Sequence, residues 1–124
     1  MSRSQRDAEA FVVTCEDCAV ETRTDDPNET VAFYRRHRSA TGHDVVWEGA
    51  DAAALDGLDV PADADLAAVV RALDGAYEGG VPLGVVAAAM GERGATMAET
   101  FEAVHDLRMT GGLYEPRDDH LRPF

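Results

Sequence analysis

The chain of 124 residues contains no lysine and no isoleucine, and only 6% of its residues are aromatic. It has no run of about 18 apolar residues, the length that a membrane-spanning helix needs, so we expect no contact with a membrane. The first residues are polar and contain no hydrophobic signal core, which favours a cytoplasmic protein. Without lysine, the chain also cannot contain the G-x-x-x-x-G-K-[ST] phosphate loop of nucleotide hydrolases.

Positive charge is scarce as well. All 11 basic residues are arginines, whereas 24 residues are acidic, and the formal net charge is -13. A chain this rich in Asp, Glu, Ala, Val and Gly resembles the proteins of extreme halophiles, in which surface carboxylates hold water and cations in concentrated salt. We therefore expect a halophilic protein, and the acidity indicates the solvent more than it indicates a binding partner.

Only two cysteines are present, Cys15 and Cys18, and in a reducing compartment metal ligation or plain thiols are favoured over a disulfide. With His37 and His43 they form the pattern C-x2-C, 18 intervening residues, and H-x5-H. Two neighbouring thiolates and two neighbouring imidazoles complete one tetrahedral zinc site. All four ligands would then come from the protein, so the predicted Zn2+ is structural and leaves no open position for catalysis.

The residues around this pattern predict a small ββα(β) module over residues 10–48. Alternating residues predict a hairpin with the cysteines at its tip, and residues 44–48 predict a final strand. Asp26 followed by Pro27 predicts the start of a helix that extends to about residue 39. The module resembles C2H2 zinc fingers of the ββα kind, with a longer middle spacer. A unit of about 40 residues buries too little surface to fold alone, so the metal would supply the missing stability.

Two other interpretations of the cysteines stay open. They could form a redox-active dithiol, although Glu16 and Asp17 lie between the two sulfurs and disfavour the thiolate that such chemistry requires. The spacing could also be a coincidence of two small buried residues and two surface histidines.

Residues 34–38, Tyr-Arg-Arg-His-Arg, form the only dense positive cluster in the sequence. On the predicted helix, Arg35, Arg36 and Arg38 could contact the phosphates of DNA. The alternative is a solvated helix face, because the helix dipole favours cations near the C-terminal end.

The second half predicts a different kind of unit. Residues 1–9 are predicted to be disordered, and residues 49–64, rich in Ala, Asp and Gly, predict a linker. Residues 65–124 then predict three helices, of which the third begins at a capping box formed by Thr96 and Glu99. Two strands around a polar turn at residues 117–120 follow, and the prolines within them suit an edge ribbon.

Two motifs in this half carry a family resemblance. Glu-Gly-Gly-Val-Pro-Leu at residues 78–83 and Gly-Leu-Tyr-Glu-Pro-Arg-Asp-Asp-His-Leu-Arg at residues 112–122 are similar to the C-terminal winged-helix domain of archaeal minichromosome maintenance helicases. The resemblance covers about residues 65–124 and implies a winged helix-turn-helix fold that takes part in DNA transactions. It implies no catalysis, because the helicase ATPase is missing. The fold class expected for the whole chain is α+β.

The expected function is a DNA-binding winged-helix protein with a structural zinc, acting as a transcriptional regulator or as a replication accessory factor. Beyond the finger helix, the candidate contacts to duplex DNA are Arg108, Arg117, His120 and Arg122. The alternative is a docking module for a DNA-associated protein, since carboxylates on the third helix would lie unfavourably beside phosphates. A homodimer stays open. No enzyme is expected, because no nucleophile elbow, phosphate loop or open metal site is found.

Overall fold

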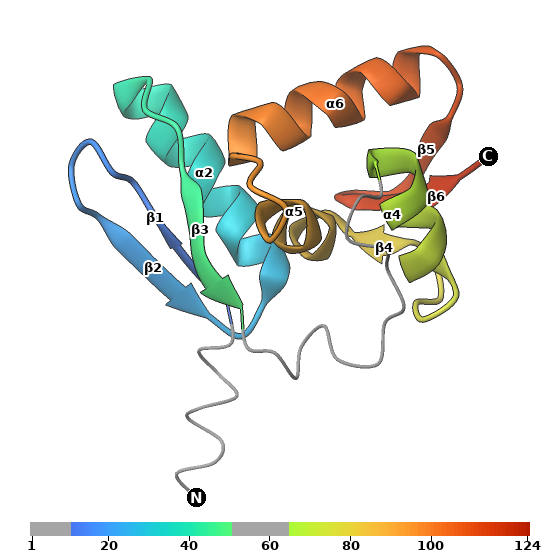
Figure 1. Ribbon diagram of the computed structural model, residues 1–124, viewed down its shortest axis with the longest axis horizontal. Helices are drawn as coiled ribbons and strands as arrows, with labels where there is room; N and C mark the ends of the chain where they lie inside the picture. The colour runs from blue at the N-terminus through green and yellow to red at the C-terminus, as the bar shows by residue number, and fades with distance from the viewer. Residues whose placement is uncertain (1–10, 51–64) are drawn as a thin grey trace, which may run out of the picture.

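The computed structural model describes residues 11–50 and 65–124, which form an α+β fold with four helices and two antiparallel three-stranded sheets (Figure 1). The predicted disordered N-terminus and nearly all of the predicted linker lie outside the described residues. Within the described parts, no helix combines the length and the apolar character that crossing a bilayer requires.

The first sheet has the strand order β2-β1-β3 and confirms the predicted hairpin and final strand. Its strands are β1 (Phe11–Thr14), β2 (Glu21–Thr24) and β3 (Val46–Ala50). The strand β3 begins two residues later than predicted. The reason is that Asp44 and Val45 bind the start of a distant helix: Asp44 Oδ1 accepts the N–H of Ala98, and the Val45 carbonyl accepts the N–H of Met97.

Helix α2 (Pro27–Thr41) connects β2 to β3. Asp26 caps its N-terminus as predicted, because its side chain accepts the N–H of Asn28 at 3.0 Å. The helix ends two residues later than predicted, at Thr41. Gly42 follows it with a φ of 78°, a left-handed conformation that glycine adopts without strain.

The second half contains three helices and the second sheet, whose strand order is β4-β6-β5. The elements are α4 (Leu66–Asp74), β4 (Val81–Pro82), α5 (Leu83–Gly91), α6 (Met97–Met109), β5 (Leu113–Arg117) and β6 (His120–Pro123). The predicted capping box is present at the start of α6. Helix α5 is buried on nearly all sides, because α2, α4, α6 and β3 all pack against it.

The predicted edge ribbon is wrong in one respect, since β6 is the middle strand of its sheet. The sheet still tolerates both prolines. The short strand β4 pairs only with His120 and Leu121, so Pro123 at the far end of β6 faces no third strand. Pro116 lies where the pairing of β5 with β6 shifts register, which relieves it of a ladder hydrogen bond.

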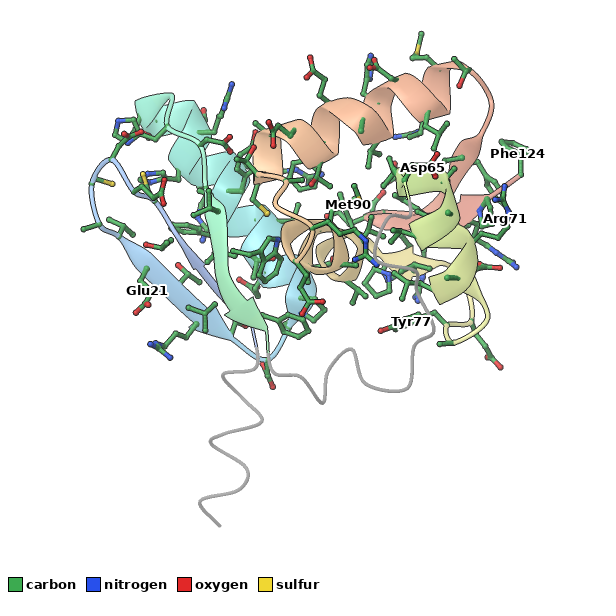
Figure 2. All side chains as sticks on the ribbon, in the orientation of Figure 1. Glu21, Asp65, Arg71, Tyr77, Met90 and Phe124 are labelled. Atoms are coloured by element: carbon green, nitrogen blue, oxygen red, sulfur yellow. The ribbon has the colours of Figure 1, made fainter. Side chains whose placement is uncertain are left out.

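The two predicted modules share buried side chains. One hydrophobic cluster consists of residues from the second half together with Val31 of α2, and a second joins Val13, Tyr34 and Val45 to Ala87 and Met97. Side chains accordingly occupy the region between α2 and α5 (Figure 2). The described residues therefore pack as one body, and the domain boundaries stay predictions.

Candidate metal centre

Four side chains meet at one end of the first sheet. Cys15 and Cys18 lie in the turn between β1 and β2, His37 lies in α2, and His43 follows the end of that helix. One ligand atom from each residue lies within 4.8 Å of all the others. The prediction that these residues come together is confirmed, and the cluster could bind a metal ion.

The distances suit a tetrahedral ion. Cys15 Sγ lies 3.5 Å from His43 Nδ1, and Cys18 Sγ lies 3.4 Å from His37 Nε2. Zinc bonds of about 2.3 Å to sulfur and about 2.05 Å to nitrogen would separate a sulfur and a nitrogen ligand by about 3.6 Å. The other pairs of ligand atoms lie within 4.8 Å, so side-chain movements of about 1–1.5 Å would bring them to the separations of about 3.3–3.8 Å that a tetrahedral zinc site requires.

The turn that carries the cysteines is tight. The Cys15 N–H donates to the Val20 carbonyl at 2.9 Å, and the Ala19 N–H donates to the Cys15 carbonyl at 2.8 Å. Ala19 has a φ of 60°, a left-handed conformation that costs a residue with a Cβ about 1 kcal/mol. This strained turn directs both sulfurs towards the histidines, and Cys15 is fully buried while Cys18 reaches the surface.

The end of α2 places the two histidines. The Thr41 hydroxyl donates to the His37 carbonyl at 2.7 Å and accepts the N–H of His43 at 3.1 Å. His37 also stacks on Phe33, with ring centroids 5.4 Å apart. Thr41 therefore joins the backbones of both ligands and determines how the chain leaves the helix towards His43.

Desolvation is the main cause that raises the pKa of the Cys18 thiol above its ordinary value, and the nearby Cys15 and Asp17 raise it further. The attacking sulfur of a redox dithiol must be an accessible thiolate, and Cys18 is the exposed sulfur of this pair. Its raised pKa therefore disfavours the redox alternative. A bound cation would instead supply the positive charge that stabilises thiolates.

The arginines predicted to contact DNA fall into two groups. Three of the arginines form ion pairs with acidic side chains of this chain: Arg35 with Asp119 at 2.9 Å, Arg108 with Glu115 at 2.8 Å and Arg122 with Asp74 at 3.2 Å. Arg36, Arg38 and Arg117 are exposed and form no ion pair within residues 11–50 and 65–124. His120 is half-buried, and its Nδ1 lies 2.7 Å from the Asp118 carbonyl oxygen within the same turn.

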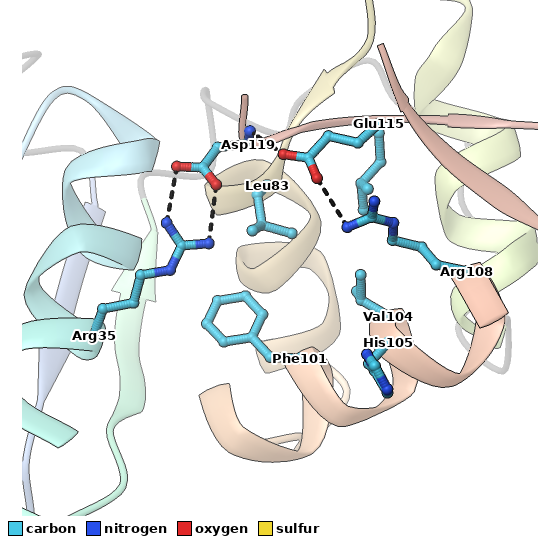
Figure 3. A pocket seen from close by; sticks show the side chains of 9 residues that line it. Arg35, Leu83, Phe101, Val104, His105, Arg108, Glu115 and Asp119 are labelled. Carbon is cyan, nitrogen blue, oxygen red and sulfur yellow. Dashed lines mark hydrogen bonds and ion pairs between the residues drawn. The ribbon is translucent and has the colours of Figure 1, made fainter. Parts of the chain in front are cut away.

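Two of these ion pairs lie beside a cavity of about 150 Å³ between α2, α6 and the hairpin of β5 and β6 (Figure 3). Arg35 binds both carboxylate oxygens of Asp119, whose backbone N–H donates to Glu115, and Glu115 in turn accepts from Arg108. Ligand pockets usually measure about 300–1,000 Å³, so this cavity is small. Its arginines are already neutralised by carboxylates.

Sequence reasoning missed the roles of Thr41 and Asp44 around the cluster. The sequence predicts a strand that includes Asp44, although aspartate is depleted in strands and commonly forms local hydrogen bonds to backbone amides. That preference of aspartate was the one local feature of the sequence that could have indicated a capping role for Asp44. The helix that it caps begins 53 residues further along the chain, and no local pattern indicates such a partner.

The fold and the cluster together define a small α+β protein with a Cys2His2 site suited to a metal ion. Two family models match the chain: residues 12–49 match the one described as HVO_B0008 N-terminal, and residues 71–121 match the one described as HVO_B0008 C-terminal domain. No curated protein and no solved structure matches the chain. The resemblances to C2H2 fingers and to the helicase winged helix stay predictions.

Proposed function

We propose that this protein is a winged-helix protein with a structural zinc centre and that it binds duplex DNA, as a transcriptional regulator or a replication accessory factor. The observation that carries the proposal is the order of elements in the second half, α4-β4-α5-α6-β5-β6, with β4 paired to β6 and β6 paired to β5. This is the order of a winged helix-turn-helix. In that motif α6 would be the helix that enters the major groove, and the turn between β5 and β6 would be the wing.

Zinc is the metal that best suits the donor set. Two thiolates and two imidazoles in a tetrahedral arrangement favour zinc over magnesium or calcium, which prefer oxygen ligands. When bound, the ion would cross-link the hairpin turn to the end of α2, and it would supply no catalysis because the protein fills all four positions. Metal analysis of purified protein tests this part, with one zinc per chain expected.

The arginines that are free to meet phosphates are Arg36, Arg38 and Arg117, which are exposed and have no acidic partner among the described residues. Arg35, Arg108 and Arg122 are committed to carboxylates, so phosphates would have to replace those partners. Counterion release contributes little in concentrated salt, and a DNA-binding protein that works there needs fewer basic contacts than usual.

The test is binding to fluorescent duplex DNA across a series of KCl concentrations. At the lowest salt of the series, about 0.1 M KCl, we expect the combined Arg36→Gln, Arg38→Gln and Arg117→Gln variant to lose about tenfold or more in affinity, because three phosphate contacts disappear. The difference should shrink as the salt concentration rises. Arg71→Gln is the matched control, since Arg71 is an exposed arginine on α4, outside the proposed interface (Figure 2). Equal affinity of the triple variant and the wild type, or no binding at any salt concentration, would overturn the DNA-binding proposal.

A second function, docking to a DNA-associated protein, is favoured by one observation. The exposed side of α6 carries Glu99, Glu102 and Asp106, which would oppose the phosphates of a major groove. Under this proposal the acidic residues contact a basic partner. A partner that co-purifies with the wild type and is lost from a Glu102→Gln, Asp106→Asn variant, with no DNA binding in either protein, would support docking.

A further inference from the structure

The chain segment directly after His43 binds the other half of the molecule. Asp44 Oδ1 accepts the N–H of Val45 at 2.7 Å and the N–H of Ala98 at 3.0 Å. The Val45 carbonyl accepts the N–H of Met97, also at 3.0 Å. Met97 and Ala98 are the first two residues of α6, and amides in the first turn of a helix have no acceptor within the helix. Residues next to a metal ligand therefore supply the acceptors that α6 lacks.

The local capping box does not make this contact redundant. Thr96 Oγ1 accepts the N–H of Glu99, and Glu99 Oε1 accepts the N–H of Thr96. These bonds leave the amides of Met97 and Ala98 unsatisfied. Two of the amides in the first turn of α6 thus depend on the segment that follows His43.

The same segment is anchored to the cluster at its other end. Thr41 binds both the His37 carbonyl and the His43 N–H, and Gly42 makes the left-handed turn between them. Val45 is fully buried in the hydrophobic cluster that also contains Met97. Residues 41–45 therefore form a short connection with metal ligands at one end and the start of α6 at the other.

We propose that metal binding at the Cys15–Cys18–His37–His43 cluster is thermodynamically linked to the capping of α6, and that Asp44 is the positioning residue that makes the link. The proposal rests on the metal centre of the proposed function but not on DNA binding. An ion that fixes His43 also fixes Asp44 and Val45, which stabilises the first turn of α6. Because linkage is reciprocal, the contact of Asp44 with α6 also prepares His43 for the ion and raises metal affinity.

The first measurement is amide hydrogen exchange of the full chain with zinc bound and after chelation. We expect the Met97 and Ala98 amides to lose protection when the metal is removed, while the Val70 amide in the middle of α4 changes far less. Equal protection of Met97 and Ala98 with and without zinc would overturn the link.

The second measurement is the affinity for zinc, by competition with a chromophoric chelator, in variants at Asp44. We expect Asp44→Ala to weaken zinc binding by up to about fivefold, the factor that corresponds to the stability usually lost with one capping side chain if all of that stability is linked to the metal. Asp44→Asn should restore the affinity, because the amide oxygen still accepts hydrogen bonds. Asp65→Ala is the matched control, since Asp65 caps α4 in the same way, with a 3.0 Å bond to the Ala68 N–H, but contacts no residue of the cluster.

The outcomes separate this proposal from the function above. Stoichiometric zinc binding that is equally tight in Asp44→Ala and in the wild type would overturn the link and leave the zinc centre in place. No zinc uptake by the wild type would overturn both. A protein that binds zinc in an Asp44-dependent way but binds no DNA would support the link and overturn only the DNA-binding proposal.

Discussion

The two halves of the described molecule, residues 11–50 and residues 65–124, are stabilised in different ways. The second half buries large aliphatic side chains from every helix and from its sheet, such as Leu73, Leu113 and Leu121. The first half buries few, mainly Val13, Val31 and Val45, and none of the side chains on the edge strand β2 is fully buried. Burial of an aliphatic side chain contributes about 1.5–3 kcal/mol, so the apolar contribution to stability is concentrated in the second half.

The first half, with its smaller apolar contribution to stability, has two further sets of contacts between residues that lie far apart in the sequence. One is the Cys2His2 cluster, which joins the hairpin turn to the end of α2. The other is the packing of α2 on α5, where Gly84 brings the two helices so close that a Cβ would overlap the Pro27 carbonyl. The comparison teaches that a small half without its own large core depends on contacts between distant residues, here its packing on the other half and a cluster that could bind a metal ion.

The largest expected effect comes from removing a metal ligand. Cys18→Ala should abolish stoichiometric metal binding and lower the free energy of unfolding by more than about 3 kcal/mol, since metal binding free energy is folding free energy in such sites. Cys18 is exposed, so the substitution removes little packing and the loss reports on the metal. Metal analysis and urea unfolding check it, with Glu16→Gln as a control in the same turn. An equally stable Cys18→Ala protein would show that the first half needs no ion.

A smaller effect is expected at the contact between the halves. Gly84→Ala should lower the free energy of unfolding by about 2–3 kcal/mol, because the new methyl group would collide with the backbone of Pro27 and push α2 away from α5. Gly75→Ala is the control, since its φ is -67° and no atom lies within 4 Å of the new Cβ. Urea unfolding of both variants checks the prediction. Similar stability of both variants would mean that the two halves adjust without loss.

The cluster and the contact between the halves also show which features could be predicted from the sequence and which could not. Helix starts at Asp26 and at Thr96 were predictable because a capping side chain and its amide lie within three residues. The four ligands were predictable because thiolate and imidazole pairs at short spacing have a specific chemistry, although a long spacer separates the pairs.

The contacts between the halves were not predictable in this way. Gly84 matters because of Pro27, which lies far away in the sequence, and a glycine at the start of a helix has no distinctive local pattern. The pairing of Arg35 with Asp119 also joins the two halves. The central position of β6 depends on its pairing with the short strand β4. Such features depend on which parts of the folded chain pack together, and no local pattern in a single sequence indicates those contacts.

Within the second half, the ion pair between Arg122 of β6 and Asp74 at the end of α4 should contribute little. Both side chains are partly exposed, and exposed pairs typically contribute about 0.2–1 kcal/mol, less in concentrated salt. A double-mutant cycle of Arg122→Gln and Asp74→Asn, measured by urea unfolding in low and in molar KCl, checks this. A coupling energy well above 1 kcal/mol that persists in molar KCl would show that this half also depends on electrostatic contacts.

The smallest effect concerns Tyr77, which packs against the core of the second half. Burial raises the pKa of its phenol, so above about pH 10 the unfolded chain loses this proton more readily than the folded protein. The stability that Tyr77 contributes is therefore complete below that pH and declines as the pH rises towards the folded pKa. Because the chain has no lysine, its three tyrosines and two cysteines are the main side chains that titrate near this range. Urea unfolding between pH 9 and pH 11 should show a shallower decline for Tyr77→Phe than for the wild type, and parallel declines would contradict the prediction.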